Sequence, residues 1–311
     1  ETQAILAGDA LQASVEELLR WIDHADQRVR MKAQFELVRR GDFGKLNIAL
    51  INQKSSLLGK LHAIWGIGQN LRKQQHMAIF LLAVVADTLG EPEMIAQAAK
   101  VLGDLDPESE HAVIFRPHLR QLLTHESPRV PFFAAISLGK LGDSSAFDPL
   151  VDLLAKQGAN DPYIRHAAIM GLTGVANAEK LAALSTHPSR SVRLGAIVAL
   201  RRQKDAAVSA FLKDPEELVL LEAARAIHDD LSIPAALPDL AALLERKGLQ
   251  SEALLRRVIN AAFRDGSDLG LKQLETYLKN GEGSRKLRRT ALASIMWWSQ
   301  PPVLDAVEGR Y

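Results

Sequence analysis

A helical stripe with alanine at its centre recurs along the 311-residue chain. In each copy an apolar residue is followed four positions later by Ala, and four positions after that by a larger aliphatic residue. Such positions line one side of an α-helix, and the small alanine lets a neighbouring helix approach closely. The pattern therefore predicts tightly packed helices. The copies are Val29-Ala33-Leu37, Met94-Ala98-Leu102, Val130-Ala134-Leu138, Ile164-Ala168-Leu172, Val192-Ala196-Leu200, Val219-Ala223-Ile227 and Leu287-Ala291-Ile295.

A helix-start residue stands three positions before the stripe in several copies. Its side-chain oxygen can accept a hydrogen bond from a backbone N–H that lacks a partner in the first helical turn. A second apolar-periodic segment, such as 15–21 or 115–123, precedes each capped helix, so the repeating unit is a pair of helices. The predicted caps are Asp26, Ser127, Asp161, Ser189 and Ser284.

The pairs indicate an all-α fold. No two-residue alternation with hairpin turns recurs, and aromatic residues make up only 5% of the chain, which is low for a sheet protein. Tandem helical pairs cannot bury their apolar faces alone and stack into a superhelix. We therefore predict an α-solenoid of about nine pairs over residues 14–298, with an N-terminal lead-in at 1–13 and a C-terminal linker or tail at 299–311.

Residues 26–30 and 161–165 resemble the second helix of HEAT repeats. In that family an Asp and an Arg from successive repeats form a ladder along the stack. Here the ladder would be discontinuous, because Ile95, Pro131 and Leu220 occupy the Arg position in three units. The residues that the resemblance implies for the ladder are Asp26, Arg30, Asp161, Arg165, Arg193 and Arg288.

Three strings, at residues 24–37, 58–65 and 302–311, resemble more narrowly the HEAT region of planctomycete-type membrane-bound dehydrogenases, also called haem-binding proteins. In that family a β-propeller precedes the HEAT array and a c-type cytochrome module follows it. The resemblance implies these modules as partners and a periplasmic or secreted bacterial location, although the sequence itself suits the cytoplasm too. Neither module lies in this chain, so we expect it to be an excised part of a longer protein.

Charge and composition narrow the function classes. With 38 Lys+Arg against 37 Asp+Glu the net charge is +1, so no global field would gather nucleic acid or an anionic membrane surface. The absence of cysteine excludes thiolate metal sites and disulfides. The apolar segments are too short to span a bilayer, and we expect no membrane insertion.

Motifs for catalysis are missing from the sequence. It holds no phosphate loop, nucleophile elbow or zinc-protease string, and Gly66-Ile67-Gly68 follows a helical segment, which favours a close helix contact over a dinucleotide loop. We expect no catalytic residue, metal or cofactor. Among the nine histidines, His24, His125 and His187 share one register, two residues before the cap. Contact with the negative end of the preceding helix is the favoured role, with metal or haem ligation as the alternative.

Two groups of residues are candidates for an interaction surface. His62 and Trp65 lie one turn apart and could contact a partner, although burial between helices is the favoured interpretation. The second group is the basic run that contains Arg285 and Arg289, followed by Trp297 and Trp298. Such residues could hold a nucleic-acid backbone and stack on a base, but the helical period makes a solvated outer face the favoured interpretation.

The leading functional hypothesis is a non-catalytic scaffold, not an enzyme, that holds other modules or proteins at fixed separation. A nucleic-acid-binding protein of the HEAT-like DNA-repair type is the alternative, although nucleic acid is not the expected partner of a chain with so little net charge. A lyase-like role that resembles phycobilin lyases of the HEAT type is a third possibility, and no residue demands it.

Overall fold

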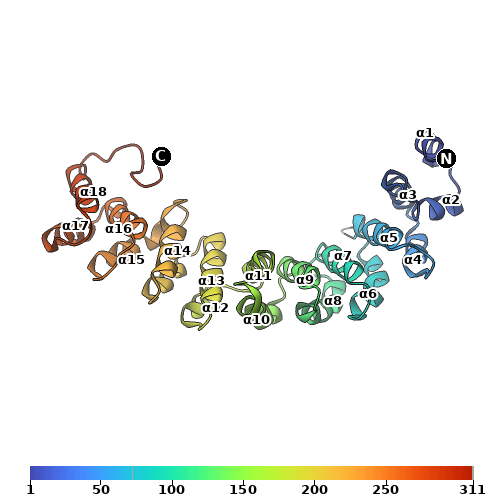
Figure 1. Cartoon of the computed structure of the whole chain (residues 1–311), viewed down its shortest axis with the longest axis horizontal. Coiled ribbons are helices and arrows are strands. Elements are labelled where there is room, and N and C mark those ends of the chain that lie inside the picture. Colours follow the sequence, from blue (N-terminus) through green and yellow to red (C-terminus); the bar gives the residue numbers. More distant parts are fainter. Residues whose placement is uncertain (72, 310–311) are drawn as a thin grey trace. The chain divides into compact units, whose positions relative to one another are not determined.

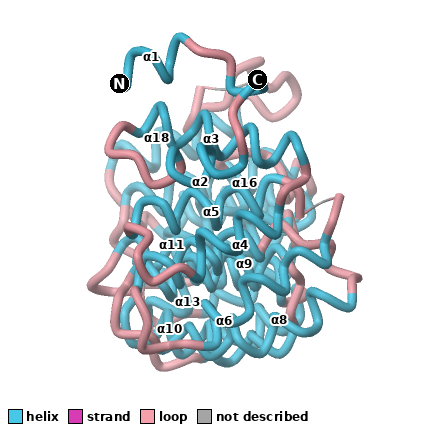
Figure 2. The backbone as a smooth tube through the Cα atoms, turned by 90° about the vertical axis from the view of Figure 1, so that its right-hand side faces the viewer, coloured by secondary structure: helices cyan, strands magenta, loops and turns pink. Residues whose placement is uncertain are grey.

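The computed structural model describes residues 1–71 and 73–309. Within these ranges the chain consists of α-helices, short 3-10 helices and turns, with no strand (Figures 1 and 2). The predicted all-α solenoid is confirmed. The described helices form nine pairs, of which five belong to a compact unit at Glu1–Val175 and four to a second unit that begins at Ala176.

In the first unit the second helix of each pair contacts the second helix of the next, so these helices form one layer and the first helices another. A lead-in made of α1 (Thr2–Ala7) and η1 (Ala10–Gln12) precedes the pairs. The pairs are α2 (Val15–Trp21) with α3 (Gln27–Arg40); α4 (Phe43–Ile51) with α5 (Leu57–Gln69); η2 (Gln75–Leu81) and α6 (Leu82–Ala86) with α7 (Pro92–Leu102); α8 (Glu110–Gln121) and η3 (Leu122–Thr124) with α9 (Arg129–Lys140); and η4 (Ser144–Ala146) and α10 (Phe147–Gln157) with α11 (Pro162–Val175).

The second unit repeats this two-layer arrangement, and several of its first helices are partly or wholly 3-10. Its pairs are α12 (Ala178–Ala183) and η5 (Leu184–Thr186) with α13 (Arg190–Gln203); η6 (Ala206–Lys213) with α14 (Glu217–His228); η7 (Pro234–Ala236), α15 (Leu237–Ala241) and η8 (Ala242–Glu245) with α16 (Glu252–Asp265); and α17 (Asp268–Asn280) with α18 (Arg285–Met296).

The central alanines of the repeated stripe form the seam between helices. All of them have no exposed surface: Ala33, Ala98, Ala134, Ala168, Ala196, Ala223 and Ala291. Two second helices depart from the order apolar residue, alanine, larger aliphatic residue. In α5 the stripe begins with Gly59 ahead of the buried Ala63, and in α16 the buried series Leu254, Val258, Ala262 ends on alanine instead of centring on it.

Glycines replace alanine where helices come closest. A Cβ atom built on Gly174 of α11 would lie 2.1 Å from the carbonyl oxygen of Gly139 in α9. Gly66 and Gly68 serve close contacts as well: a Cβ on either would lie 2.8 Å from the side chain of Leu46 or Val101, respectively. The helix-contact interpretation of this Gly-Ile-Gly string therefore agrees with the structure.

The lead-in is more structured than a simple extension. Lys32 of α3 donates hydrogen bonds to the last carbonyls of α1, among them Ile5 at 2.9 Å. Arg40 at the other end of α3 donates to carbonyls around η1, among them Ala13 at 2.9 Å. Two long cationic side chains thus fasten residues 1–13 to the first pair by satisfying carbonyls that have no helical partner.

Replacing Gly174 by Ala is expected to lower the free energy of unfolding by about 1–3 kcal/mol, since the added methyl group meets backbone that cannot move aside. Gly44→Ala is the matched control. Gly44 is a helical glycine whose added methyl group would have no neighbouring atom within 4 Å, and Ala there should be neutral or stabilising by up to about 1 kcal/mol. Urea denaturation measures both, and equal effects of the two substitutions would contradict the close contact.

Candidate functional site

The predicted caps divide into two groups. The side chains of Asp26, Asp161 and Ser284 accept backbone N–H groups of the first helical turn at 2.8, 2.8 and 3.2 Å. Ser127 and Ser189 differ. Helix α9 begins only at Arg129, with Pro128 directly before it, and Ser189 makes no side-chain capping bond. These two predicted caps are therefore corrected.

Three histidines in one register accept hydrogen bonds within the turns of their own pairs. Nδ1 of His24, His125 and His187 accepts the backbone N–H of the residue two positions later, at 2.9, 3.0 and 3.1 Å. The acceptor role requires a neutral nitrogen at Nδ1. The imidazoles thus stabilise the turn inside each pair, and this contact replaces the predicted one with the end of the preceding helix.

The predicted Asp–Arg ladder between repeats is corrected in part. Arg30, Arg165 and Arg288 donate to carbonyls in the turn of their own pair, for Arg30 at 2.7 Å from two successive carbonyl oxygens. Arg193 does the same and also reaches Asp214, in the turn before α14, at 2.7 Å. The carboxylates of Asp26 and Asp161 are engaged in capping, and the unpaired turn carbonyls are nearer acceptors for the arginines.

His62 and Trp65 join neighbouring pairs and offer little surface to a partner. His62 is buried, with Nδ1 2.6 Å from Oε1 of Gln34 in α3, and its ring meets that of Trp65 edge-on at 5.0 Å. The half-buried Trp65 donates through Nε1 to Gln97 of α7 at 2.9 Å. Burial, with a smaller contribution from Arg30, lowers the pKa of His62 to about 4. The structural interpretation therefore holds for this pair, and its place in an interaction surface is corrected.

A cationic pocket of about 880 Å³ lies between α16, α18 and the C-terminal tail. Arg285 and Arg289 of α18 line it together with Trp297, so the structure gathers three residues that the sequence singled out. Arg256 of α16 joins them, although it lies about thirty residues earlier and no sequence signal marked it. Trp298 turns instead toward Phe263, with ring centroids 5.8 Å apart, and lines a neighbouring cavity of about 340 Å³.

The pocket concentrates positive charge. Lys286, which also lines it, forms an ion pair with Glu252 at 2.7 Å, and this contact, with a smaller one from Arg256, lowers the pKa of that carboxyl. Within the described part of the chain, Arg285 and Arg289 have no carboxylate partner. They stand at the start of α18, where the helix itself carries partial positive charge. The arrangement suits an anionic group.

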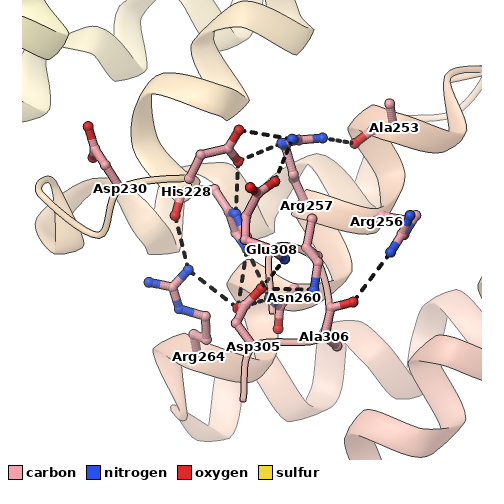
Figure 3. Close-up of polar contacts among 12 residues, drawn as sticks. His228, Asp230, Ala253, Arg256, Arg257, Asn260, Arg264, Asp305, Ala306 and Glu308 are labelled. Atoms are coloured by element: carbon pink, nitrogen blue, oxygen red, sulfur yellow. Dashed lines mark hydrogen bonds and ion pairs between the residues drawn. The ribbon is translucent and has the colours of Figure 1, made fainter. Parts of the chain in front are cut away.

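The tail forms one wall of this pocket and is held by a buried polar cluster (Figure 3). Asp305 accepts the backbone N–H groups of Val307 and Glu308, each at 2.8 Å, and a hydrogen bond from Asn260 of α16. Asn260 in turn lies 2.9 Å from Nε2 of the fully buried His228. These bonds fold the tail back onto α14 and α16.

Arginines of α16 complete the attachment. Arg257 bridges Asp229 at the end of α14 and Glu308 of the tail, at 2.7 and 3.0 Å, and Arg256 donates to the carbonyl of Ala306 at 3.3 Å. The tail is therefore held against α14 and α16 through Asp305, Ala306 and Glu308. The last two residues of the predicted tail and of the family-like string, Arg310 and Tyr311, lie outside the described residues.

Comparison with known proteins identifies the type of repeat in part of the chain. A family profile described as HEAT repeats matches residues 80–173. The chain contains HEAT repeats. No curated protein sequence matches it.

Solved structures that are similar to this chain share little sequence with it. The Escherichia coli protein YibA is 15% identical, with 94% of each chain covered and a TM-score of 0.45. Human deoxyhypusine hydroxylase is 17% identical, covering 85% of this chain and 98% of its own, at 0.33. The CpcE–CpcF phycocyanin lyase of Nostoc is 16% identical, covering 94% and 97%, at 0.26.

Two further observations concern metals and membranes. In residues 1–71 and 73–309, no three His, Asp or Glu side chains gather into a group that could hold a metal ion. No helix in the described part of the chain is long and apolar enough to cross a bilayer.

The buried His62 makes the stability of the HEAT array pH-dependent. Its pKa falls from an ordinary 6.5 to about 4 on folding, so between these values the unfolded chain binds more protons and stability is lost as the pH falls. His62→Gln cannot titrate and should lose less unfolding free energy than the parent over that window. Urea denaturation at several pH values tests this, and parallel profiles would contradict it. His228 is present in both proteins and cancels in the comparison.

Replacing Asp305 by Ala should release the tail from α14 and α16. Hydrogen bonds to a charged group contribute about 1.5–3 kcal/mol each, so amide exchange in residues 299–309 should quicken by about tenfold or more. Val303→Ser alters an exposed residue of the same segment and serves as control. Hydrogen exchange followed by mass spectrometry measures both variants. Unchanged exchange rates in the tail of the Asp305 variant would show that the hydrogen bonds of Asp305 do not hold the tail in place.

Proposed function

We propose that this chain is a non-catalytic HEAT scaffold that binds other protein modules and holds them at fixed separation. The observation that carries the proposal is the outward face of α18. Arg285, Arg289, Leu292 and Met296 follow one another at helical spacing, and Leu292 and Met296 are 50% and 74% exposed. Exposed apolar side chains that adjoin one another on a helix favour coverage by another protein module.

The family-like strings support a particular setting for such a scaffold. In the dehydrogenase-like haem-binding proteins that they resemble, a β-propeller and a c-type cytochrome flank the HEAT region. A rigid array of helical pairs would fix the distance between these redox modules for electron transfer. The proposed partners are therefore protein modules of this kind in a bacterial periplasmic or secreted protein.

Binding to separately purified propeller and cytochrome modules, measured by titration calorimetry, tests the proposal. Leu292→Glu combined with Met296→Glu should weaken binding by about tenfold or more, because two apolar contacts would be replaced by charges. Leu269→Glu is the matched control, since Leu269 of α17 is 59% exposed and lies outside this face. Dye-linked oxidation of sugars or alcohols by the chain alone would overturn the non-catalytic role.

The pocket on α16 and α18 favours nucleic-acid binding as a second candidate function. Cationic side chains beside the exposed Trp297 could hold phosphates and stack on a base. Binding to duplex DNA that weakens steeply with added salt would support this alternative. Absence of binding at low ionic strength would remove it.

A further inference from the structure

We infer that the pocket between α16, α18 and the tail binds a carboxylate-rich peptide segment of a partner protein, with an aromatic or aliphatic side chain beside the carboxylates. The inference rests on the proposed scaffold function and names the chemistry of one partner contact. It draws on the charge of the pocket, its apolar surface and the construction of its wall.

The pocket arginines are unlike those around them. Several other arginines on the second helices of the second unit have carboxylate partners: Arg193 with Asp214, Arg201 with Asp230, Arg225 with Glu222 and Arg257 with Asp229. Of the pocket's cations only Lys286 forms an ion pair, with Glu252. Arg256, Arg285 and Arg289 converge without a bound carboxylate in the described residues, and no acidic side chain lines the pocket. A partner's carboxylates would supply the missing charge.

The geometry of the cations suits carboxylates. A guanidinium group offers paired N–H donors that match the two oxygens of a carboxylate. Arg285 and Arg289 lie one turn apart on the same side of α18, where like charges repel in the free protein. A carboxylate placed between them would relieve the repulsion, so binding of an acidic segment has a favourable term that a neutral ligand lacks.

Apolar surface in the same pocket favours a ligand that carries an apolar group as well as negative charge. Trp297 is 54% exposed, and Phe263 and Pro302 lie along the lining with it. Exposed tryptophan beside arginine is typical of residues that dominate binding energy in protein interfaces. The volume of about 880 Å³ lies within the usual range for ligand pockets and accommodates a side chain together with its charged neighbours.

The confined charge favours a peptide over a nucleic acid. Duplex or single-stranded nucleic acid is bound along a track of cations that follows successive phosphates. Here Arg193 and Arg201 of α13 and Arg225 of α14 form ion pairs, and the whole chain has a net charge of +1. The three arginines that line the pocket lie on α16 and α18, and this compact group fits a short acidic segment.

The tail forms part of the pocket before any ligand binds, so the site is preorganised. Pro302 and Ala306 form its wall, and Asp305 between them is tied to Asn260. The contact between Asp305 and Asn260 thus positions this wall, and its loss should weaken binding although all the cations of the pocket remain.

The test uses the full chain and a fluorescein-labelled peptide of glutamates around one phenylalanine, followed by fluorescence anisotropy. The same peptide with glutamines, and oligothymidine and duplex DNA, are the comparison probes. We expect the glutamate peptide to bind, more weakly as salt is added, and the glutamine peptide to bind at least about tenfold less tightly. Arg285→Gln with Arg289→Gln, and separately Trp297→Ala, should each weaken binding by about tenfold or more.

Arg202→Gln, which removes an exposed arginine of α13 outside the pocket, should leave the affinity unchanged. Asp305→Ala should weaken binding by a smaller factor, and circular dichroism verifies that every variant is folded. Equal loss in Arg202→Gln, or tighter binding of either DNA than of the acidic peptide, would overturn the assignment. If no peptide binds while the propeller or cytochrome module still does, this inference fails and the scaffold proposal stands.

Discussion

Close approach of the second helices is the constraint on which the rest of the structure depends. Dispersion and the exclusion of water act only at short range, so a stack of short helices is stable where small residues let backbones meet. The fully buried alanines provide this along both units, and Gly139 and Gly174 bring α9 and α11 closer still. Since the helices pack at this seam, their opposite faces are free to vary, and the pocket residues of α18 lie on such a face.

Short helices create a second demand, because every turn leaves backbone groups without helical partners. Four arginines at one position of the repeat donate to turn carbonyls: Arg30, Arg165, Arg193 and Arg288. Of these, Arg193 also forms an ion pair with Asp214. Histidine provides the complementary acceptor for N–H groups in three of the turns. The polar residues that recur with the repeat therefore form hydrogen bonds with the backbone of the turns. Arginines that make no such bond within the described residues, such as Arg285 and Arg289, are candidates for binding.

How far the sequence could predict the structure follows from the range of the interactions involved. Helix pairs, stripes and the caps at Asp26, Asp161 and Ser284 depend on residues a few positions apart, and spacing reveals them. The sequence could not predict that Arg256 lines the same pocket as Arg285 and Arg289, because this placement depends on the register between α16 and α18. The fold-back of residues 299–309 was missed for a related reason: Asp305 meets Asn260 through a contact that no local pattern encodes. For the serine at 189, nothing in the structure explains why it does not cap.

The tail lies outside every helical pair and yet completes a cavity. A protein shortened just after α18 would keep all its described helical pairs, and its far-ultraviolet spectrum would be nearly that of the parent, since residues 299–309 contain no helix. Its cavity would nevertheless be open on one side. Changes in residues 299–309 can therefore alter the selectivity of the recess while the helical pairs keep the alanine seam that holds them together.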